Sequence, residues 1–354
     1  LHDLNFVAPD VSPTKPGATT ETLKAGSTFR QAGARVLTAE KFTQDVLEMP
    51  SNAQTKFLGY NFYKPEVQPG AKVPLVVFLH GSGQSHDYKH FPTDFKADVL
   101  SPLLANQGGV AWVERAKEKA FVLVPQAPAR DTADSAGERG WRSADTQKLL
   151  LALVDKVIAE NPAIDTQRLY LTGLSMGAMG SWKIITNPDS AVSRKFASAV
   201  LFNGGPRKTF GSEPGETLEQ MDARIAPELK QVDFRPVAIP LWLGHGDTDP
   251  VVTRAGSRVP FAQLTGKART DAAGALLPEQ GVLKTSSALV RLYAAANRFH
   301  GTEVRYTEYQ YGNGEPFREL GMVTRHGHFT WEAGYKDQAI IEWMFAQRKV
   351  TAAP

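Results

Sequence analysis

Short runs of apolar residues recur along the chain, each ending at glycine or a polar loop, and they predict the buried strands of a parallel sheet. The clearest runs are Val73 to Leu79, Phe121 to Val124, Arg168 to Leu171, Ala199 to Phe202 and Ile239 to Leu243. Between the second and third runs, apolar residues recur at helical spacing up to Pro162, and Ser143 or Asp145 can cap that helix. This alternation predicts an α/β fold with helices on both faces of a mostly parallel sheet.

The segments before the first and after the last of these apolar runs show other patterns. Polar and apolar residues alternate at Ala34 to Leu37 and at Lys56 to Tyr63, which predicts antiparallel edge strands that start the sheet. Val304 to Gln310 alternates in the same way and predicts the last strand. Ser287 to Phe299 has helical spacing, and Asp337 to Gln347 is the predicted final helix.

Two long polar stretches interrupt the array. Residues 206–237 contain a predicted helix at Thr217 to Lys230, and residues 254–286 are rich in Gly, Ala, Thr and Lys. Connections of this length are uncommon inside a compact domain, so we interpret both as insertions that form a cap or rim. Residues 1–27 predict an extended N-terminal arm, and residues 28–354 a single domain.

Composition excludes several classes of function. The chain has 354 residues, with 40 Lys and Arg against 37 Asp and Glu, and this balance gives no reason to expect a nucleic-acid partner. No apolar run approaches the roughly 18 residues of a membrane span. Cysteine is absent, which excludes disulfides, thiolate metal sites and a cysteine nucleophile. The start at Leu-His-Asp and the polar opening suggest a secreted or periplasmic protein after signal-peptide removal, although a trimmed chain would look the same.

The strongest chemical signal is Ser175, which stands between Gly173 and Gly177 directly after a buried strand. A serine raised above the end of a parallel sheet needs a very tight strand-to-helix turn, where a Cβ two residues away on either side has no room. The pattern therefore predicts a nucleophile elbow. A chance match and a phosphate-binding loop are the alternatives, but the chain has no Gly-Lys-Ser/Thr sequence here.

A serine nucleophile also needs two backbone N–H groups that stabilise the developing oxyanion. One comes from the residue after the nucleophile, here Met176, and the other from an early glycine-rich loop. His80-Gly81-Ser82-Gly83 ends a buried strand and predicts Ser82 as that second donor, with a plain β-turn as the alternative. Trp141, in a loop after the next strand, is expected either to form a wall of the acyl pocket or to pack in the ordinary way.

The acid of a catalytic triad is expected in the polar turn at residues 244–252, directly after a buried strand. Two aspartates compete for that role. We favour Asp249, while Asp247 is expected to hold the loop by accepting hydrogen bonds from backbone N–H groups. His245 comes too early in the chain for the base, and we interpret it as a residue that packs the loop.

The base is expected in the loop before the final helix. His328 can accept the proton of Ser175 through Nε2 while its other ring nitrogen donates to Asp249, and His326 is the alternative. The two histidines could also form a metal pair, but no third ligand with recognisable spacing accompanies them. We therefore predict no metal and no cofactor.

These motifs together resemble those of the bacterial "predicted peptidase" group of α/β-hydrolases, which is related to polyhydroxybutyrate-depolymerase-like and feruloyl esterases. The similarity covers roughly residues 56–348 and is carried by the nucleophile elbow and by these segments: Pro-Leu-Val-Val-Phe-Leu-His-Gly at 74–81, Val-Pro-Gln-Ala-Pro at 124–128, His-Gly-Asp-Thr-Asp-Pro-Val-Val at 245–252, Tyr-Thr-Glu-Tyr at 306–309 and Gly-His-Phe-Thr-Trp at 327–331.

The resemblance implies an α/β-hydrolase fold and a serine hydrolase with the triad Ser175, Asp249 and His328. The preference for His328 over His326 rests mainly on the last motif. Residues expected at the substrate are Gly81, Trp141 and Trp331. The chain departs from the group at Ala178, where glycine is common, and in the length of its two insertions, so the group's substrate preferences do not transfer.

The sequence thus predicts an enzyme that hydrolyses carboxylic esters, either small molecules or polyesters, without a cofactor. A peptidase or amidase, including one that cleaves a polyamide, would use the same residues on a poorer leaving group. A metal-dependent hydrolase is a further alternative, and so is a non-catalytic binding protein built on a hydrolase fold.

Overall fold

The computed structural model describes residues 38–48, 57–86, 108–116, 118–128, 134, 136–207, 211–272, 274–311 and 326–349. The arm predicted over residues 1–27 and the strand predicted at Ala34 to Leu37 lie outside the described residues. Among the described helices, none is both long enough and apolar enough to cross a membrane.

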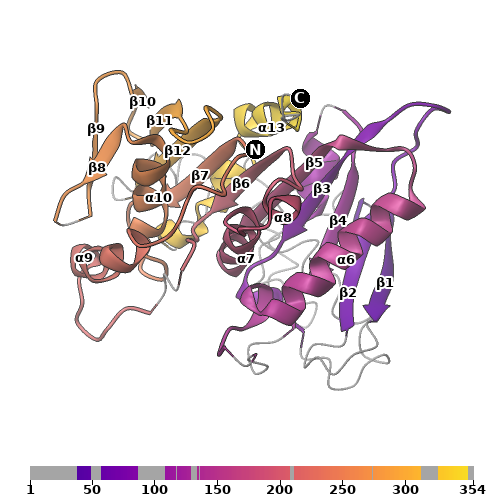
Figure 1. Ribbon diagram of the computed structural model, residues 1–354, viewed down its shortest axis with the longest axis horizontal. Helices are drawn as coiled ribbons and strands as arrows, with labels where there is room; N and C mark the ends of the chain where they lie inside the picture. The colour runs from indigo at the N-terminus through magenta and orange to yellow at the C-terminus, as the bar shows by residue number, and fades with distance from the viewer. Residues whose placement is uncertain are drawn as a thin grey trace, which may run out of the picture.

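A ten-stranded sheet organises the described residues, with the strand order β1-β2-β4-β3-β5-β6-β7-β12-β11-β10 (Figure 1). The six strands from β4 to β12 in this order are parallel, whereas β1, β2, β11 and β10 pair antiparallel at the two edges. The strands are β1 (Phe42–Glu48), β2 (Phe57–Tyr63), β3 (Val73–Leu79), β4 (Phe121–Gln126), β5 (Ile164–Leu174), β6 (Ser198–Phe202), β7 (Leu241–Gly246), β10 (Leu283–Ser286), β11 (Val290–Ala296) and β12 (Glu303–Tyr309). The mostly parallel sheet predicted from the apolar runs is confirmed.

Helices cover both faces of the sheet, and each face has its own apolar core. Alternate side chains of β3 separate the two: Leu75, Val77 and Leu79 lie in one core, and Val76 and Phe78 in the other. The described helices are α5 (Val110–Arg115), α6 (Ala144–Glu160), α7 (Met176–Ile185), α8 (Ser190–Ser193), α9 (Leu218–Leu229), α10 (Ala255–Thr265), α12 (Trp331–Gly334) and α13 (Gln338–Ala346).

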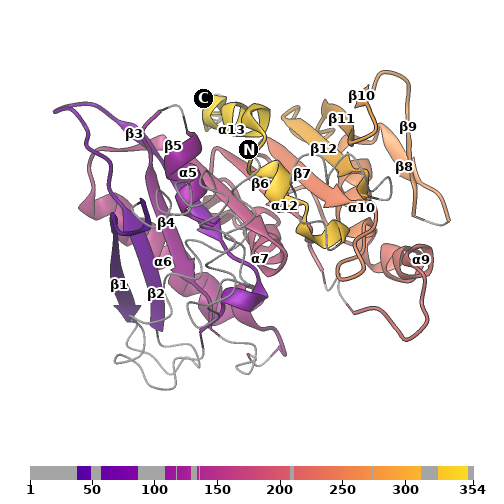
Figure 2. The same ribbon diagram turned by 180° about the vertical axis from the view of Figure 1, so that it is seen from behind.

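The first core contains residues of α6, α7 and α10, and the second contains residues of α5, α12 and α13. The opposite views in Figures 1 and 2 show α6 in front of the sheet in one and α5 and α12 in front in the other. The two-faced layering predicted from the strand and helix alternation is therefore present. The cap of α6 is Ser143, whose side chain accepts a hydrogen bond from the Thr146 N–H.

One predicted element is wrong. The segment from Ser287 to Phe299 contains a strand, β11, in place of the expected helix. Its seven residues pair antiparallel with β12 along their whole length. Leu289, Leu292, Tyr293 and Ala296 have helical spacing, whereas Val290, Leu292 and Ala294 alternate as in a strand. The full ladder of hydrogen bonds that β12 supplies decides between the two patterns. The sequence pattern also gave no sign of β1, a mostly polar edge strand.

The two segments predicted as insertions differ in how they pack. In the first, α9 begins with a capping box formed by Thr217 and Gln220, and its apolar side packs on α10. In the second, α10 contributes Phe261 and Leu264 to the main core. Only the residues after α10 reach the periphery, where β8 (Ala268–Thr270) and β9 (Leu276–Pro278) form a separate hairpin (Figure 1).

Candidate active site

Ser175 occupies the turn between β5 and α7 with φ 51° and ψ −118°. Such a backbone conformation is rare for a residue with a Cβ, costs on the order of 1–3 kcal/mol and persists only where the surrounding structure imposes it. Two backbone hydrogen bonds hold it: the Ser175 N–H donates to the Phe202 carbonyl (2.9 Å), and the Ser175 carbonyl accepts from the Met179 N–H (3.0 Å). Ser175 therefore has the strained strand–turn–helix setting that its flanking glycines predict.

The flanking glycines are required by close backbone contact. A Cβ on Gly173 would lie 2.7 Å from the carbonyl carbon of Gly177, so the turn could not close. A Cβ on Gly177 would overlap the carbonyl oxygen of Leu79, the last residue of β3. The turn thus packs directly against the strand that leads into the predicted oxyanion loop.

That loop follows β3 and is held by three hydrogen bonds around His80. The His80 carbonyl accepts from Trp141 Nε1 (3.0 Å), and its ring Nε2 accepts from the Ala127 N–H (2.9 Å). Since Nε2 is an acceptor, the ring proton lies on Nδ1, which is 2.6 Å from the Gly81 carbonyl oxygen. These contacts fix the direction in which the chain leaves β3.

The two predicted oxyanion donors lie on either side of Ser175. Met176 is the first residue of α7, so its N–H has no acceptor within the helix. A Cβ on Gly81 would lie 3.7 Å from the Ser175 Cβ, which places the loop beside Ser175. Ser82 is the next residue and begins the 3-10 turn Ser82–Gln84. The structure thus places Gly81 and Met176 beside Ser175, with Ser82 directly after Gly81.

His80 also couples protein stability to pH. Its side chain is fully buried, and burial lowers its pKa to about 4. In the unfolded chain, histidine takes up a proton near pH 6.5, so acid favours unfolding between pH 6.5 and 4. We expect His80 to remove about 3 kcal/mol of stability over this range.

The measurement is urea unfolding between pH 7 and 4, compared with the variant His80→Gln. Glutamine can accept from the Ala127 N–H and donate to a carbonyl oxygen but does not titrate. The free energy of unfolding should therefore fall less steeply with acid in His80→Gln than in the parent protein. Equal slopes would contradict this origin of the pH dependence.

Asp249, in the loop after β7, forms a pair with His328. Its carboxylate is 1% exposed, and Oδ2 is 2.8 Å from His328 Nδ1. Oδ1 accepts the backbone N–H groups of Val251 (2.8 Å) and Val252 (2.9 Å). Burial raises the pKa of Asp249, but the charge of His328 and hydrogen bonds from His245 and His328 outweigh it, and the net direction is downward. Asp249 is therefore an ionised carboxylate at neutral pH.

Its rival Asp247 is connected to the fold through its backbone. The Asp247 N–H donates to the Tyr309 carbonyl (2.9 Å), and its carbonyl accepts from Arg254 Nη1 (2.7 Å). Oδ1 of Asp249 itself accepts two backbone N–H groups of this loop, the kind of bond expected of Asp247. The structure thus pairs Asp249 with a histidine.

His328 is held by its neighbours so that Nδ1 faces Asp249 and Nε2 faces away from it. Its ring packs edge-on against Trp331, with the ring centroids 4.9 Å apart. The alternative base, His326, lies at the start of the short turn Gly327–Phe329 and accepts a hydrogen bond from the His328 N–H (3.3 Å). His326 therefore helps to orient the loop, and His328 is the histidine at the acid.

Two further residues, neither of which is expected at the site from its place in the sequence, contact the Asp249 carboxylate. Asn203 Nδ2 donates to Asp249 Oδ2 (2.8 Å) and to the Gly327 carbonyl (3.0 Å). His245 packs the loop as expected, since it is fully buried with Nε2 3.1 Å from the Val252 carbonyl oxygen, and the same Nε2 is 3.1 Å from Asp249 Oδ2. An Asn-Gly-Gly sequence directly after a buried strand was the available signal for Asn203.

Asn203 also connects the serine to the acid and the base. Its neighbour Phe202 accepts the Ser175 N–H, and Asn203 itself bonds to the acid loop and to the histidine loop. A Cβ on Gly327 would lie 2.9 Å from the Asp249 nitrogen, so these two loops pack backbone to backbone. Ser175, Asp249 and His328 accordingly follow β5, β7 and β12 at one edge of the sheet.

The two tryptophans expected at the substrate are buried. Trp141 has no exposed surface, and its indole N–H donates to the His80 carbonyl. It also lies so close to Gly180 that a Cβ there would overlap the Trp141 Cβ. A residue without exposed surface does not line a pocket open to substrate, which favours the packing alternative for Trp141. Trp331 is 2% exposed and lies behind His328. Both residues therefore support the oxyanion loop and the base from behind.

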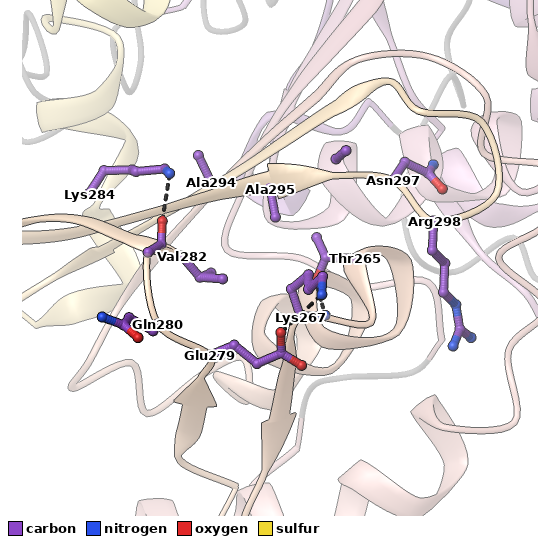
Figure 3. Close-up of a pocket in the computed structure, with 12 residues that line it drawn as sticks. Thr265, Lys267, Glu279, Gln280, Val282, Lys284, Ala294, Ala295, Asn297 and Arg298 are labelled. Carbon is purple, nitrogen blue, oxygen red and sulfur yellow. Dashed lines mark hydrogen bonds and ion pairs between the residues drawn. The ribbon is translucent and has the colours of Figure 1, made fainter.

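A cavity of about 460 Å³ lies elsewhere, where the end of α10 meets β10 and β11 (Figure 3). Lys267 and Glu279 form an ion pair across it at 3.1 Å. None of its lining residues is among the predicted site residues. The cavity is therefore separate from the serine, acid and base.

Comparison with known proteins identifies the fold. No protein-family model matches the sequence, and curated protein sequences give no match. Among solved structures, a thermostable esterase is similar over 88% of this chain with a TM-score of 0.56 and 26% identity. The chain spans 64% of that esterase, just under two thirds of its length. Together with the sheet order, this similarity shows that the protein has an α/β-hydrolase fold, as predicted.

More distant structures have lower TM-scores. An acylaminoacyl peptidase from Pyrococcus horikoshii covers 91% of this chain and 44% of its own, with a TM-score of 0.47 and 16% identity. Esterase 2 from Thermogutta terrifontis, phosphoramylated by tabun, covers 63% of this chain and 77% of its own, with a TM-score of 0.40 and 17% identity. Similarity at this level carries no argument about function.

Proposed function

We propose that this protein is a serine hydrolase that cleaves carboxylic esters through an acyl-enzyme intermediate. The observation that carries the proposal is the ionised Asp249 paired at 2.8 Å with His328, on the same sheet edge as the strained Ser175. The similarity to a thermostable esterase supports it. So does the resemblance of the motifs to those of polyhydroxybutyrate-depolymerase-like esterases.

In the proposed reaction, Ser175 Oγ attacks the acyl carbon of the ester while His328 Nε2 takes the serine proton. Asp249 holds the Nδ1–H of His328 and stabilises the imidazolium that forms. The oxyanion of the tetrahedral intermediate accepts from the N–H groups of Met176 and Ser82. His328 then protonates the leaving alcohol, and water, activated by the same histidine, releases the acid from Ser175.

The experiment is labelling with a fluorophosphonate, which reacts with activated serines, followed by mass spectrometry of the peptides. We expect one label on Ser175 and its loss in Ser175→Ala. The control is Ser181→Ala, since Ser181 lies on the same helix and its hydroxyl donates to the Gly177 carbonyl. Labelling at a different serine, or undiminished labelling of Ser175→Ala, would refute the proposal.

A peptidase or amidase remains the second candidate, because the same residues act on an amide and because the motifs resemble the "predicted peptidase" group. The leaving group decides between them: an amine is a poorer leaving group than an alcohol and depends more strongly on protonation as it leaves. We expect p-nitrophenyl esters of short acids to be hydrolysed, and the matching p-nitroanilides and peptides to show no turnover above that of Ser175→Ala. Turnover of the amides well above that background would reverse the assignment.

A further inference from the structure

Asp222, on the inserted helix α9, is a buried carboxylate that contacts the end of the acid loop, which we define as residues 247–254. The residue is 1% exposed. Its Oδ2 accepts from Arg254 Nε at 2.8 Å, and Oδ1 accepts from Thr253 Oγ1 and from the Ala255 N–H at 3.2 Å. A buried charge is expensive unless several donors satisfy it, and here the end of the loop supplies two of them and the first residue of α10 the third.

Arg254 connects that carboxylate to the beginning of the same loop. While Nε donates to Asp222, Nη1 donates to the Asp247 carbonyl at 2.7 Å and Nη2 to Glu219 Oε1 at 3.0 Å. One planar guanidinium therefore joins both ends of the loop to α9. Asp249 lies between the two attachment points, two residues after Asp247. The loop has little freedom to move relative to α9.

The helix itself is anchored to the domain. Its apolar residues form a small cluster with α10, made of Met221, Ile225, Ala226, Leu229, Ala255 and Val259. Arg258 of α10 adds a second buried ion-pair system, with Nη1 3.3 Å from Asp222 and Nε 2.6 Å from Glu308 of β12. The charges of two arginines and two carboxylates balance in this cluster, which lets it remain buried.

We infer that Asp222 and Arg254 are positioning residues of the active site, through which the inserted helix α9 fixes the place of Asp249 against His328. This inference rests on the proposed function, because it assigns a role relative to the proposed triad. In this view α9 does not move relative to the acid loop, because Arg254 bonds the loop to this helix. The contacts of Asn203 and His245 support the acid loop from the sheet side.

The test uses Arg254→Lys and Asp222→Asn in the full-length chain. Lysine keeps the charge near Asp222, but its single ammonium group cannot reproduce the bonds of Arg254 to Asp222 and Asp247 together. We expect kcat for a p-nitrophenyl ester to fall roughly 10- to 100-fold, as for a catalytic group displaced by about 1 Å. The KM should change by less than about twofold, because neither residue belongs to the proposed acyl or oxyanion contacts.

A spectroscopic signature separates positioning from general destabilisation. The proton on His328 Nδ1, hydrogen-bonded to Asp249, should give a far-downfield NMR resonance in the parent protein that shifts or broadens in Arg254→Lys. The matched controls are Arg224→Gln, which breaks an ion pair of the same helix with Glu216, and Glu219→Gln, which removes the charge of the exposed partner of Arg254 but keeps an acceptor oxygen for Nη2. Both controls should keep the parent kcat and resonance.

The inference is overturned if Arg254→Lys and Asp222→Asn fold normally and keep the parent kcat and resonance. Should the variants not fold, hydrogen exchange in the parent protein decides: the amides of α9 and those of Val251 and Val252 should open together, and much faster exchange of α9 alone overturns the coupling. Failure of the proposed function is distinct, since it appears as retained activity in Ser175→Ala.

Discussion

Ser175→Ala should lower kcat for a p-nitrophenyl ester by about 10⁶-fold, the scale of loss seen when a serine nucleophile is removed from an assembled triad. Alanine removes only Oγ, and the turn keeps its two backbone hydrogen bonds to Phe202 and Met179. The expected defect is therefore chemical, with folding and substrate binding retained. Steady-state kinetics and a thermal melt of the same sample measure both.

Substitution of the base gives a sharper version of the same test. His328→Ala alone should cost about as much as Ser175→Ala, and the double variant should be no worse than either, because residues that act as a unit lose their contribution together. The control Ser181→Ala should keep kcat. Additive losses would mean that Ser175 and His328 do not act as a unit, and a Ser175→Ala variant that retains more than about 1% of the activity would mean that the serine is not the nucleophile.

Gly177→Ala should have the largest effect on the fold for a change of one methyl group. The added Cβ would overlap the Leu79 carbonyl oxygen and lie 2.8 Å from the His80 carbonyl oxygen. Both contacts are with backbone, so relief requires α7 to move away from β3. We expect a loss of about 1–3 kcal/mol or more, measured by urea unfolding. We also expect a loss of kcat, because the predicted oxyanion donors lie on the two elements that separate.

Gly83→Ala is the matched control. Gly83 lies in the loop that follows β3, next to the backbone that Gly177 contacts, and a Cβ on Gly83 would meet no atom within 4 Å. Its stability and kcat should stay close to those of the parent protein. If Gly83→Ala were as damaging as Gly177→Ala, general rigidity of the loop would explain the loss, and the specific clash with β3 would not.

Local patterns were enough for the parts of the fold that depend on near neighbours. The buried strands, the α6 helix with its Ser143 cap and the elbow at Ser175 each have a signature within a few residues. The apolar pattern wrongly predicted a helix at β11, because the segment around Val290 to Ala296 fits both the helical and the strand period. Only its pairing with β12 selects the strand. The pattern also gave no sign of β1, whose residues are mostly polar.

The active site shows the same division. Motif position favoured Asp249 and His328, and the structure joins them although they are 79 residues apart. Asn203 was left without a role, because its bonds to Asp249 and Gly327 span 46 and 124 residues and no local spacing encodes them. The sequence also expected Trp141 at the substrate, but its side chain is buried behind the oxyanion loop.

By itself, then, the sequence determined an alternating α/β chain with a glycine-flanked serine after a strand, because periodicity and tight turns are properties of consecutive residues. Only the tertiary structure decided which polar groups share the Asp249 carboxylate and how the inserted helix α9 joins the acid loop through Asp222 and Arg254. Those contacts exist because a buried carboxylate must find donors wherever the folded chain brings them, and sequence distance places no limit on where they come from.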